Sequence, residues 1–316
     1  MQLLLSIVFL AVGFLLLARS ADWLVAGASS LAGRFGVSDM VVGLTIVAFG
    51  TSAPELFVST ISSVRGNGAI AVGNVLGSNI ANILLVLGLA ATLRPIAIHQ
   101  RNTWREIPFC LATAVLLLVL LVVANEPFLI SRWEAAILLV ALALYLRFAF
   151  RHPMPPPAEV ADAPRQRAGV AALFVLAGLT GLIAGAELIV RGGVRIAERL
   201  GVGDDVIAVT IIAIGTSLPE MATSVAAALK GKSDIAVGNV VGSNILNTGL
   251  VLGIAGIVRP IRAAEPFVLD AGVALAGTIL LFAFMFTGKR HRFDRWEGVL
   301  CLVVYAGYIV SRTAGL

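Results

Sequence analysis

Long apolar runs alternate with short polar loops along almost the whole chain. A helix needs about 20 apolar residues to cross a hydrocarbon core of ~30 Å, and runs of this length occur ten times. They cover residues 3–32, 39–64, 69–93, 106–124, 128–150, 169–197, 205–229, 235–258, 267–287 and 297–314. This pattern predicts an all-α polytopic membrane protein with ten transmembrane helices.

A polar segment divides these spans into two groups of five. Residues 152–167 hold five prolines among charges of both signs, a composition typical of a linker. We therefore expect a first five-helix repeat over residues 1–150, a cytoplasmic linker over 151–168 and a second five-helix repeat over 169–316.

The two halves repeat each other in sequence. At an offset of 165 residues, segment 36–96 aligns without a gap with 201–261, and about 33 of the 61 aligned pairs are identical. GTSAPE at 50–55 returns as GTSLPE, and GNVLGSNIAN at 73–82 returns as GNVVGSNILN. Five spans are an odd number, so the second half enters the membrane from the opposite side. The sequence thus predicts two inverted five-helix repeats.

Composition and charge support this interpretation. Apolar residues make up 59% of the chain and charged residues 13%, whereas soluble domains average about 45–50% and about 25%. These values exclude a cytosolic enzyme and a nucleic-acid-binding protein. With the N-terminus outside, 15 of the 23 Lys and Arg residues fall in inward loops. The positive-inside rule then predicts a multi-pass protein of a bacterial-type plasma (inner) membrane, with both termini outside and the linker cytoplasmic.

Two acidic residues are predicted near mid-span, where a charge costs at least ~2.5–3.5 kcal/mol and marks a functional site. They are Glu55 and Glu220, which correspond to each other in the repeat. Each follows Gly-Thr-Ser-x-Pro, a sequence that breaks a helix. A break frees carbonyl oxygens of residues 48–51 and 213–216, which is tolerated in a membrane only where the backbone is buried or lines a wet cavity.

The nearby side chains supply oxygen ligands only. Besides the two carboxylates, we expect the hydroxyls of Ser78 and Ser243 and the amides of Asn82 and Asn247 to serve as ligands. For Asn74, Asn79 and their repeat equivalents, hydrogen bonding between helices is the competing interpretation. Such a set suits hard cations such as Ca²⁺ or Na⁺ and not Zn²⁺ or Cu⁺. Two facing carboxylates also match a divalent charge, and no permanently bound cofactor is expected.

These doubled motifs resemble the repeats of the calcium/cation antiporter superfamily, and in particular the prokaryotic sodium/calcium exchangers. The resemblance implies that Glu55 and Glu220, with the carbonyls of Thr51 and Thr216, hold Ca²⁺. It further implies that flanking Na⁺ sites are formed by Ala48, Ser52, Ser78, Ala213, Ser217 and Ser243. Asn82 and Asn247 would border the central position. Exchangers of this type often carry Asp where this chain has Asn247.

The leading hypothesis is therefore a secondary active antiporter that exchanges Ca²⁺ for Na⁺ by alternating access, with the first and sixth spans moving against the rest. An antiporter of Ca²⁺, or another divalent cation, against protons is the alternative. A cation channel is disfavoured because channels usually need a symmetric oligomeric pore. No protease constellation is present, so no enzyme is expected. The expected partners are Ca²⁺, Na⁺ and the lipid bilayer, with no nucleic acid and no obligatory protein partner.

Overall fold

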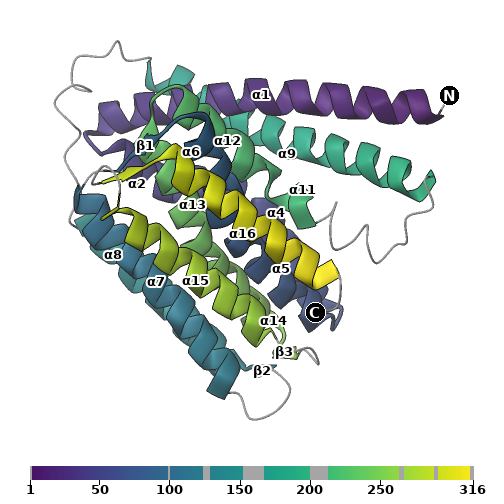
Figure 1. Cartoon of the computed structure of the whole chain (residues 1–316), viewed down its shortest axis with the longest axis vertical. Coiled ribbons are helices and arrows are strands. Elements are labelled where there is room, and N and C mark those ends of the chain that lie inside the picture. Colours follow the sequence, from purple (N-terminus) through teal and green to yellow (C-terminus); the bar gives the residue numbers. More distant parts are fainter. Residues whose placement is uncertain are drawn as a thin grey trace.

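The computed structural model describes residues 2–98, 100–123, 129–151, 167–199, 213–262, 267–287 and 291–313, and they are mostly helical (Figure 1). The first half contains α1 (Gln2–Phe35), α2 (Asp39–Val42), η1 (Gly43–Val47), α3 (Ala48–Thr51), α4 (Ala53–Val64), α5 (Gly68–Ile80), η2 (Ala81–Leu87), α6 (Gly88–Leu93), α7 (Gln100–Val123) and α8 (Arg132–Arg151), where η marks a π-helix. The second half contains α9 (Ala168–Arg199), α11 (Ala213–Thr216), α12 (Leu218–Leu229), α13 (Ser233–Leu246), η5 (Asn247–Val251), α14 (Leu252–Val258), α15 (Val268–Phe284) and α16 (Arg295–Thr313). The predicted helical class is confirmed for these residues. Most of the predicted linker and the start of the seventh span, 205–212, lie outside them.

Five helical segments of the described chain are long and apolar enough to cross a membrane, and a sixth if a bent pair counts as one span. The five cover Leu3–Phe35, Gly68–Leu93, Trp104–Val123, Ala168–Arg199 and Ser233–Val258. The bent pair is Asp39–Thr51 with Ala53–Val64. Of the other predicted spans, 205–229 lies partly outside the described residues and the rest correspond to shorter or more polar helices, so the count of ten remains a prediction.

Two long helices, α1 and α9, lie side by side and antiparallel along one side of the bundle (Figure 1). Their backbones come very close where small residues meet. A Cβ built on Gly13 would lie 2.9 Å from the Gly185 carbonyl oxygen. Near the other end of the seam, a Cβ on Gly27 would lie 2.7 Å from the Ala171 carbonyl oxygen. Small residues at such a seam allow close helix packing in a membrane.

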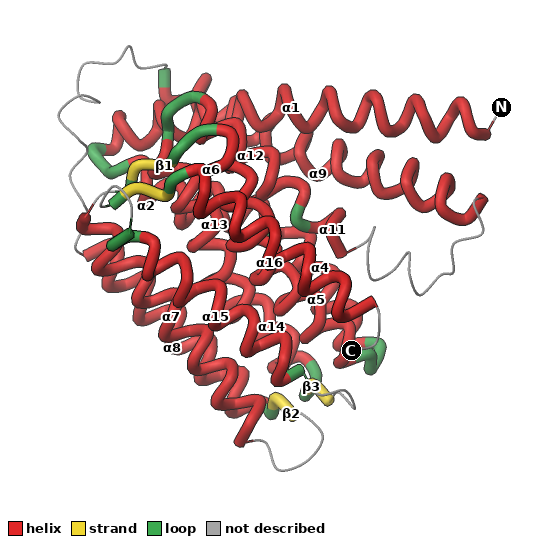
Figure 2. Tube along the Cα trace, viewed as in Figure 1, coloured by secondary structure: helices red, strands yellow, loops and turns green. Residues whose placement is uncertain are grey.

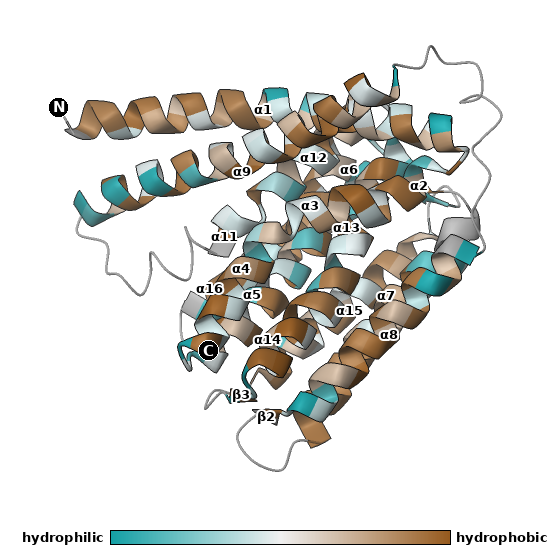
Figure 3. Ribbon diagram, turned by 180° about the vertical axis from the view of Figure 1, so that it is seen from behind, coloured by the Kyte–Doolittle hydropathy of each residue, from teal (hydrophilic) through white to brown (hydrophobic). Residues whose placement is uncertain are grey.

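The centre of the molecule is formed by the continuous segments α5–η2–α6 and α13–η5–α14. About 72% and 83% of their most apolar windows are buried, against 22% for α1. Helix α13 meets the segment before the break in the first half, because a Cβ on Gly242 would lie 2.8 Å from the Ala48 Cβ. The outer faces of α1, α7 and α8 are apolar instead (Figure 3). Exposed Leu15 and Leu144 illustrate this outward apolar surface, which suits contact with lipid.

Two short antiparallel sheets join the halves at opposite ends of the bundle (Figure 2). Strand β1 (Ile96–Ala97) pairs with β4 (Arg292–Phe293), and β2 (Leu129–Ile130) pairs with β3 (Ile261–Arg262). Each sheet therefore takes one strand from each half of the chain. The same exchange occurs at helix ends, where Arg94 Nη1 donates to the Leu229 carbonyl at 2.5 Å and Arg259 Nη1 to the Val64 carbonyl at 2.9 Å.

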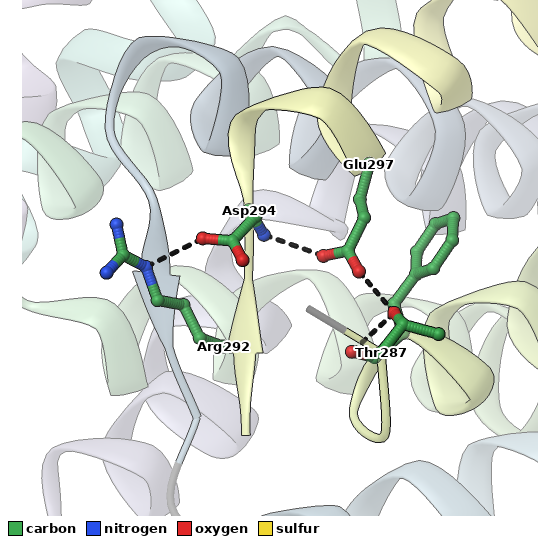
Figure 4. Close-up of polar contacts among 5 residues, drawn as sticks. Thr287, Arg292, Asp294 and Glu297 are labelled. Atoms are coloured by element: carbon green, nitrogen blue, oxygen red, sulfur yellow. Dashed lines mark hydrogen bonds and ion pairs between the residues drawn. The ribbon is translucent and has the colours of Figure 1, made fainter. Parts of the chain in front are cut away.

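The last helix begins in a side-chain cap (Figure 4). The Asp294 backbone N–H donates to Glu297 Oε2 at 2.7 Å, and the Thr287 hydroxyl donates to Glu297 Oε1. Helix α8 begins in a similar way, since the Ser131 N–H donates to Glu134 Oε2 at 2.7 Å. Such reciprocal caps satisfy N–H groups that have no partner within a helix.

Candidate functional site

The chain breaks its helices at equivalent places in the two halves. Helix α3 ends just before Ser52 and α4 begins just after it, with a 47° bend between the two segments. Ser217 separates α11 from α12 with nearly the same backbone angles, φ −87° and ψ 2° against −80° and 5°. Pro54 and Pro219 stand in the first turns that follow. They lack an N–H group, so a carbonyl one turn earlier loses its usual donor.

The predicted acidic residues lie in the first turns of α4 and α12 and are fully buried. Glu55 and Glu220 each have 0% exposure. The N-terminal end of a helix carries partial positive charge, which favours a carboxylate there. The break thus places each carboxylate at the end of a helix inside the protein. No described Lys or Arg side chain lies within ion-pair distance of either carboxylate.

Serine hydroxyls hold one oxygen of each carboxylate. Ser78 donates to Glu55 Oε1 at 3.3 Å. Ser243, its repeat equivalent, donates to Glu220 Oε1 at 3.3 Å, and Ser52 of the other half donates to the same atom at 3.2 Å. The second oxygen, Oε2, of both glutamates is buried and has no hydrogen-bond partner among the described residues.

The predicted threonines use their hydroxyls to join the two halves. Thr51 Oγ1 donates to Asn239 Oδ1 at 3.0 Å, and Thr216 Oγ1 donates to Asn74 Oδ1 at 3.5 Å. Asn239 in turn donates to the Glu220 backbone carbonyl at 3.2 Å. The hydroxyls are therefore engaged with asparagines, and a role of these threonines through their carbonyls stays a prediction.

Two asparagines present a second pair of unsatisfied oxygens. Asn82 Nδ2 donates to Asn244 Oδ1 at 3.0 Å, and Asn247 Nδ2 donates to Asn79 Oδ1 at 3.2 Å. The Oδ1 atoms of Asn82 and Asn247 are buried and, in the described chain, accept no hydrogen bond. Asn82 lies in η2 and Asn247 begins η5. π-Helical turns are rare and often occur at functional sites.

Four buried acceptor atoms on repeat-related residues therefore lack donors: Oε2 of Glu55 and Glu220, and Oδ1 of Asn82 and Asn247. Each buried acceptor without a partner costs about 1–3 kcal/mol. A bare cation satisfies such atoms, and an all-oxygen set fits Na⁺ or Ca²⁺. The described residues contain no cluster of three or more His, Cys, Asp or Glu side chains, so the negative charge comes from the two glutamates alone.

The remaining predicted ligands lie at the two breaks. The Ala48 carbonyl already accepts from the Ser52 N–H at 2.9 Å, and Thr51 Oγ1 lies 3.3 Å from it. Ser217 donates to Ser78 Oγ at 3.3 Å, so it reaches Glu55 only through that serine. Ala213 is the first residue of α11, and its side chain lies outside the described part of the structure.

Other carboxylates in the described chain are also buried, and two of them, Glu106 and Asp270, lie in helices that the sequence pattern did not mark as functional. Glu106 in α7 accepts a hydrogen bond from the Tyr145 hydroxyl of α8. Asp270 in α15 accepts one from the Tyr308 hydroxyl at 2.7 Å and pairs with Arg312 at 3.2 Å. Both carboxylates are 2% exposed. Their recurrence at offsets of 164 residues for the acids and 163 for the tyrosines was the available sequence signal.

Comparison with protein families gives one model, described as "Sodium/calcium exchanger protein", which matches residues 5–151 and 170–314. The chain is 41% identical over 316 residues to "Putative antiporter CaxA" of Alkalimonas amylolytica, covering 97% of this chain and 98% of that protein. It is 33% identical to "Sodium/calcium exchanger MaX1" of Methanosarcina acetivorans, with 96% and 97% covered.

Solved structures give a match of the same extent. The chain superposes on the sodium-calcium exchanger NCX_Mj soaked with 10 mM Na⁺ and zero Ca²⁺ with a TM-score of 0.85. The two chains are 33% identical, and the match covers 98% of this chain and 99% of that one. The likeness therefore extends over both halves of the chain.

Proposed function

The chain belongs to the sodium/calcium exchanger protein family, and on this basis we propose that it is a secondary active antiporter that exchanges Ca²⁺ for Na⁺ at a site built on Glu55 and Glu220. Cation exchange across a membrane is the activity of this family. The observation that carries the finer proposal is the set of four buried oxygens without donors, contributed equally by the two halves. They occupy two repeat-related positions, 55/220 and 82/247, and a bound cation would satisfy all four.

The proposed ligands divide into a central group and flanking groups. Glu55 and Glu220, with the carbonyls of Thr51 and Thr216, bind Ca²⁺ in the centre. Asn82 and Asn247 border that position with their free amide oxygens. The flanking Na⁺ positions draw on the residues at the breaks and the serines beside the carboxylates, namely Ala48, Ser52, Ser78, Ala213, Ser217 and Ser243. The hydrogen bonds from Ser52, Ser78 and Ser243 to the two carboxylates support this grouping.

Charge explains why such a site exchanges ions and does not leak. An empty site with two ionised carboxylates is costly to enclose in a low-dielectric interior. One Ca²⁺ neutralises both carboxylates, and two Na⁺ do the same. A third Na⁺ would leave one positive charge, so exchange would be electrogenic and driven by ~2.3 kcal/mol per 100 mV of membrane potential.

We place this site in ten spans arranged as two inverted five-helix repeats over 1–150 and 169–316. The cross-half strand pairs support it, because β1 and β3 are repeat equivalents and their sheets lie at opposite ends of the bundle (Figure 2). Arg94 and Arg259, which are also repeat equivalents, each donate a hydrogen bond to a helix end in the other half. With the linker 151–168 in the cytoplasm, both termini lie outside.

Alternating access is proposed to come from movement of α1 and α9 against the rest of the bundle. These two helices form one closely packed antiparallel pair, and they lie along the edge of the molecule (Figure 1). Their pairing makes them able to move as a unit. Helices α4 and α12, which carry the two carboxylates, belong to the part of the bundle that stays in place.

The test is Ca²⁺ uptake into proteoliposomes loaded with Na⁺, compared with vesicles loaded with acid and with vesicles that have no gradient. Uptake driven by the Na⁺ gradient, and lost in Glu55→Gln and Glu220→Gln, is the expected result. Uptake driven by the proton gradient alone would replace the proposal with a Ca²⁺/H⁺ antiporter. Wild-type uptake in either glutamine variant would reject the site. Glu106→Gln is the matched control, because Glu106 is also a buried carboxylate but is hydrogen-bonded to Tyr145.

A further inference from the structure

We propose that two further asparagines, Asn79 and Asn244, are positioning residues for the cation site. Each holds the amide of a proposed ligand, Asn247 or Asn82, so that its oxygen faces the cation. The hydroxyl of Thr248 allows the amide of Asn79 to turn over. The orientation is therefore reversible at Asn247 and not at Asn82. The inference concerns the same site and therefore rests on the proposed function.

Orientation matters because an amide has two unlike ends. Its carbonyl oxygen binds a cation, whereas its NH₂ group carries partial positive charge and repels one. Asn82 and Asn247 both turn their NH₂ groups to an acceptor in the other half, at 3.0 and 3.2 Å. Their oxygens are thereby left facing away from that partner, buried and without a donor. The accepting atoms are Oδ1 of Asn244 and Asn79, which are themselves nearly fully buried.

The two orienting asparagines are held by chemically different groups. Asn244 Nδ2 donates to the backbone carbonyl of Asn79 at 3.1 Å. Asn79 Nδ2 donates to the hydroxyl of Thr248 at 3.1 Å. A carbonyl oxygen only accepts hydrogen bonds, whereas a hydroxyl both accepts and donates. Asn244 is therefore fixed, because turning it over would place two acceptors against each other.

Asn79 is free to turn over, since the Thr248 hydroxyl then donates to its oxygen. Its NH₂ group would in that case face residue 247. At the position equivalent to Thr248, the first half carries Ile83, which offers no hydroxyl. One hydroxyl therefore distinguishes two otherwise equivalent ligand positions. Position 247 accepts either an amide or a carboxylate, and position 82 accepts only an amide.

The first test compares Asn82→Asp with Asn247→Asp. Both changes add one carboxylate to the same site at equivalent positions, so the added charge is matched. In Asn82→Asp the new carboxylate faces the fixed Oδ1 of Asn244, whereas in Asn247→Asp it meets an amide that turns over. We expect the half-saturating Ca²⁺ concentration for uptake to be about tenfold higher in Asn82→Asp than in Asn247→Asp. One unsatisfied buried contact gives a ratio of this size. Equal effects of the two changes would overturn the inference.

A second comparison leaves both proposed ligands intact. In Asn79→Asp, the carboxylate accepts from both Asn247 and the Thr248 hydroxyl. In Asn244→Asp, one carboxylate oxygen is forced against the Asn79 carbonyl. Asn244→Asp should weaken Ca²⁺ affinity more than Asn79→Asp by about tenfold, while maximal uptake per folded transporter changes less. The reverse order would contradict the assignment.

A third variant keeps the inference testable if Asn82→Asp cannot be purified. Thr248→Val removes the reversible hydroxyl with little change in shape. Asn247→Asp should then weaken Ca²⁺ affinity more in the Thr248→Val background than in the wild type. Additive effects of the two changes would show that Thr248 does not act through Asn79, and would overturn the inference.

Failure of this inference is distinguishable from failure of the proposed function. If wild-type protein takes up no Ca²⁺, or if Glu55→Gln leaves uptake unchanged, the proposed site is wrong and the asparagine variants have no bearing on it. If Glu55→Gln abolishes uptake and the paired asparagine variants behave alike, the site stands and the positioning role of Asn79 and Asn244 is rejected.

Discussion

The hydroxyl of Ser52 donates to Oε1 of Glu220 at 3.2 Å, across 168 residues of sequence. Ser217, its repeat equivalent, donates to Ser78 at 3.3 Å and not to a carboxylate. The two halves therefore contribute unequally to the site even though their sequences match at these positions. A serine that touches the carboxylate directly should affect ion binding more than one that touches it through another hydroxyl.

We therefore expect Ser52→Ala to raise the half-saturating Na⁺ or Ca²⁺ concentration by about tenfold, since hydrogen bonds to charged groups contribute about 1.5–3 kcal/mol. Ser217→Ala should have a smaller effect. Ion dependence of exchange in proteoliposomes measures both. An effect of Ser217→Ala as large as that of Ser52→Ala would contradict the unequal contribution.

Ca²⁺ should stabilise the purified protein in detergent. Binding satisfies the four donorless oxygens only in the folded state, so at a Ca²⁺ concentration about 100 times Kd the Tm should rise by about 5–10 °C. Glu220→Gln should remove most of this shift, and Glu106→Gln should keep it. Differential scanning fluorimetry measures the shift, and a full shift in Glu220→Gln would count against a site at that carboxylate.

The buried tyrosine–carboxylate pairs should matter for stability and not for ion affinity. Tyr145→Phe leaves Glu106 buried without its hydroxyl donor, so we expect a loss of about 1–3 kcal/mol in stability. Tyr308→Phe should cost less, because Asp270 keeps its pairing with Arg312. Thermal unfolding compares the two variants. A change in half-saturating Ca²⁺ in Tyr145→Phe would instead connect this pair to the transport site.

The ion pair between Lys230 and Asp22, with atoms 2.6 Å apart, ties α1 to the turn between α12 and α13. If α1 moves during exchange, Lys230→Ala should change the turnover rate and leave Ca²⁺ affinity unaltered. An exposed pair contributes only about 0–1 kcal/mol, so the change in rate should stay below about fivefold. Arg191→Ala is the control, since Arg191 pairs with Glu187 of its own helix. An equal rate change in the control would argue against a tether.

Sequence alone predicted the features that depend on pattern. The helices follow from the apolar runs, and the breaks follow from Gly-Thr-Ser-x-Pro. The two buried glutamates follow from the repeat, and the structure places them at the expected breaks, fully buried. Hydrogen bonding between helices, one of two interpretations of Asn79 and Asn244, is what the structure shows for them. The sequence pattern could not show whether these asparagines are ligands, because the direction in which an amide points depends on atoms of the other half.

Other features depend on contacts between helices, and the sequence pattern did not predict them for that reason. Glu106 stands beside Arg105 near the start of its helix, a context in which a carboxylate is usually exposed. Its burial depends on Tyr145 from the following helix. The π-helical turns at Asn82 and Asn247 leave no mark in the apolar periodicity, because one extra residue in a turn does not change which residues are apolar.

The cross-half strand pairs have a consequence for biogenesis. The first half is synthesised with β1 and β2 unpaired, because their partners β4 and β3 belong to the second half. The Val64 carbonyl at the end of α4 likewise lacks its donor until Arg259 has been synthesised. The nascent first half therefore stays incomplete in the membrane until the ribosome has delivered the rest. Neither half therefore holds a complete set of its own end contacts, and the two halves form a single unit of folding.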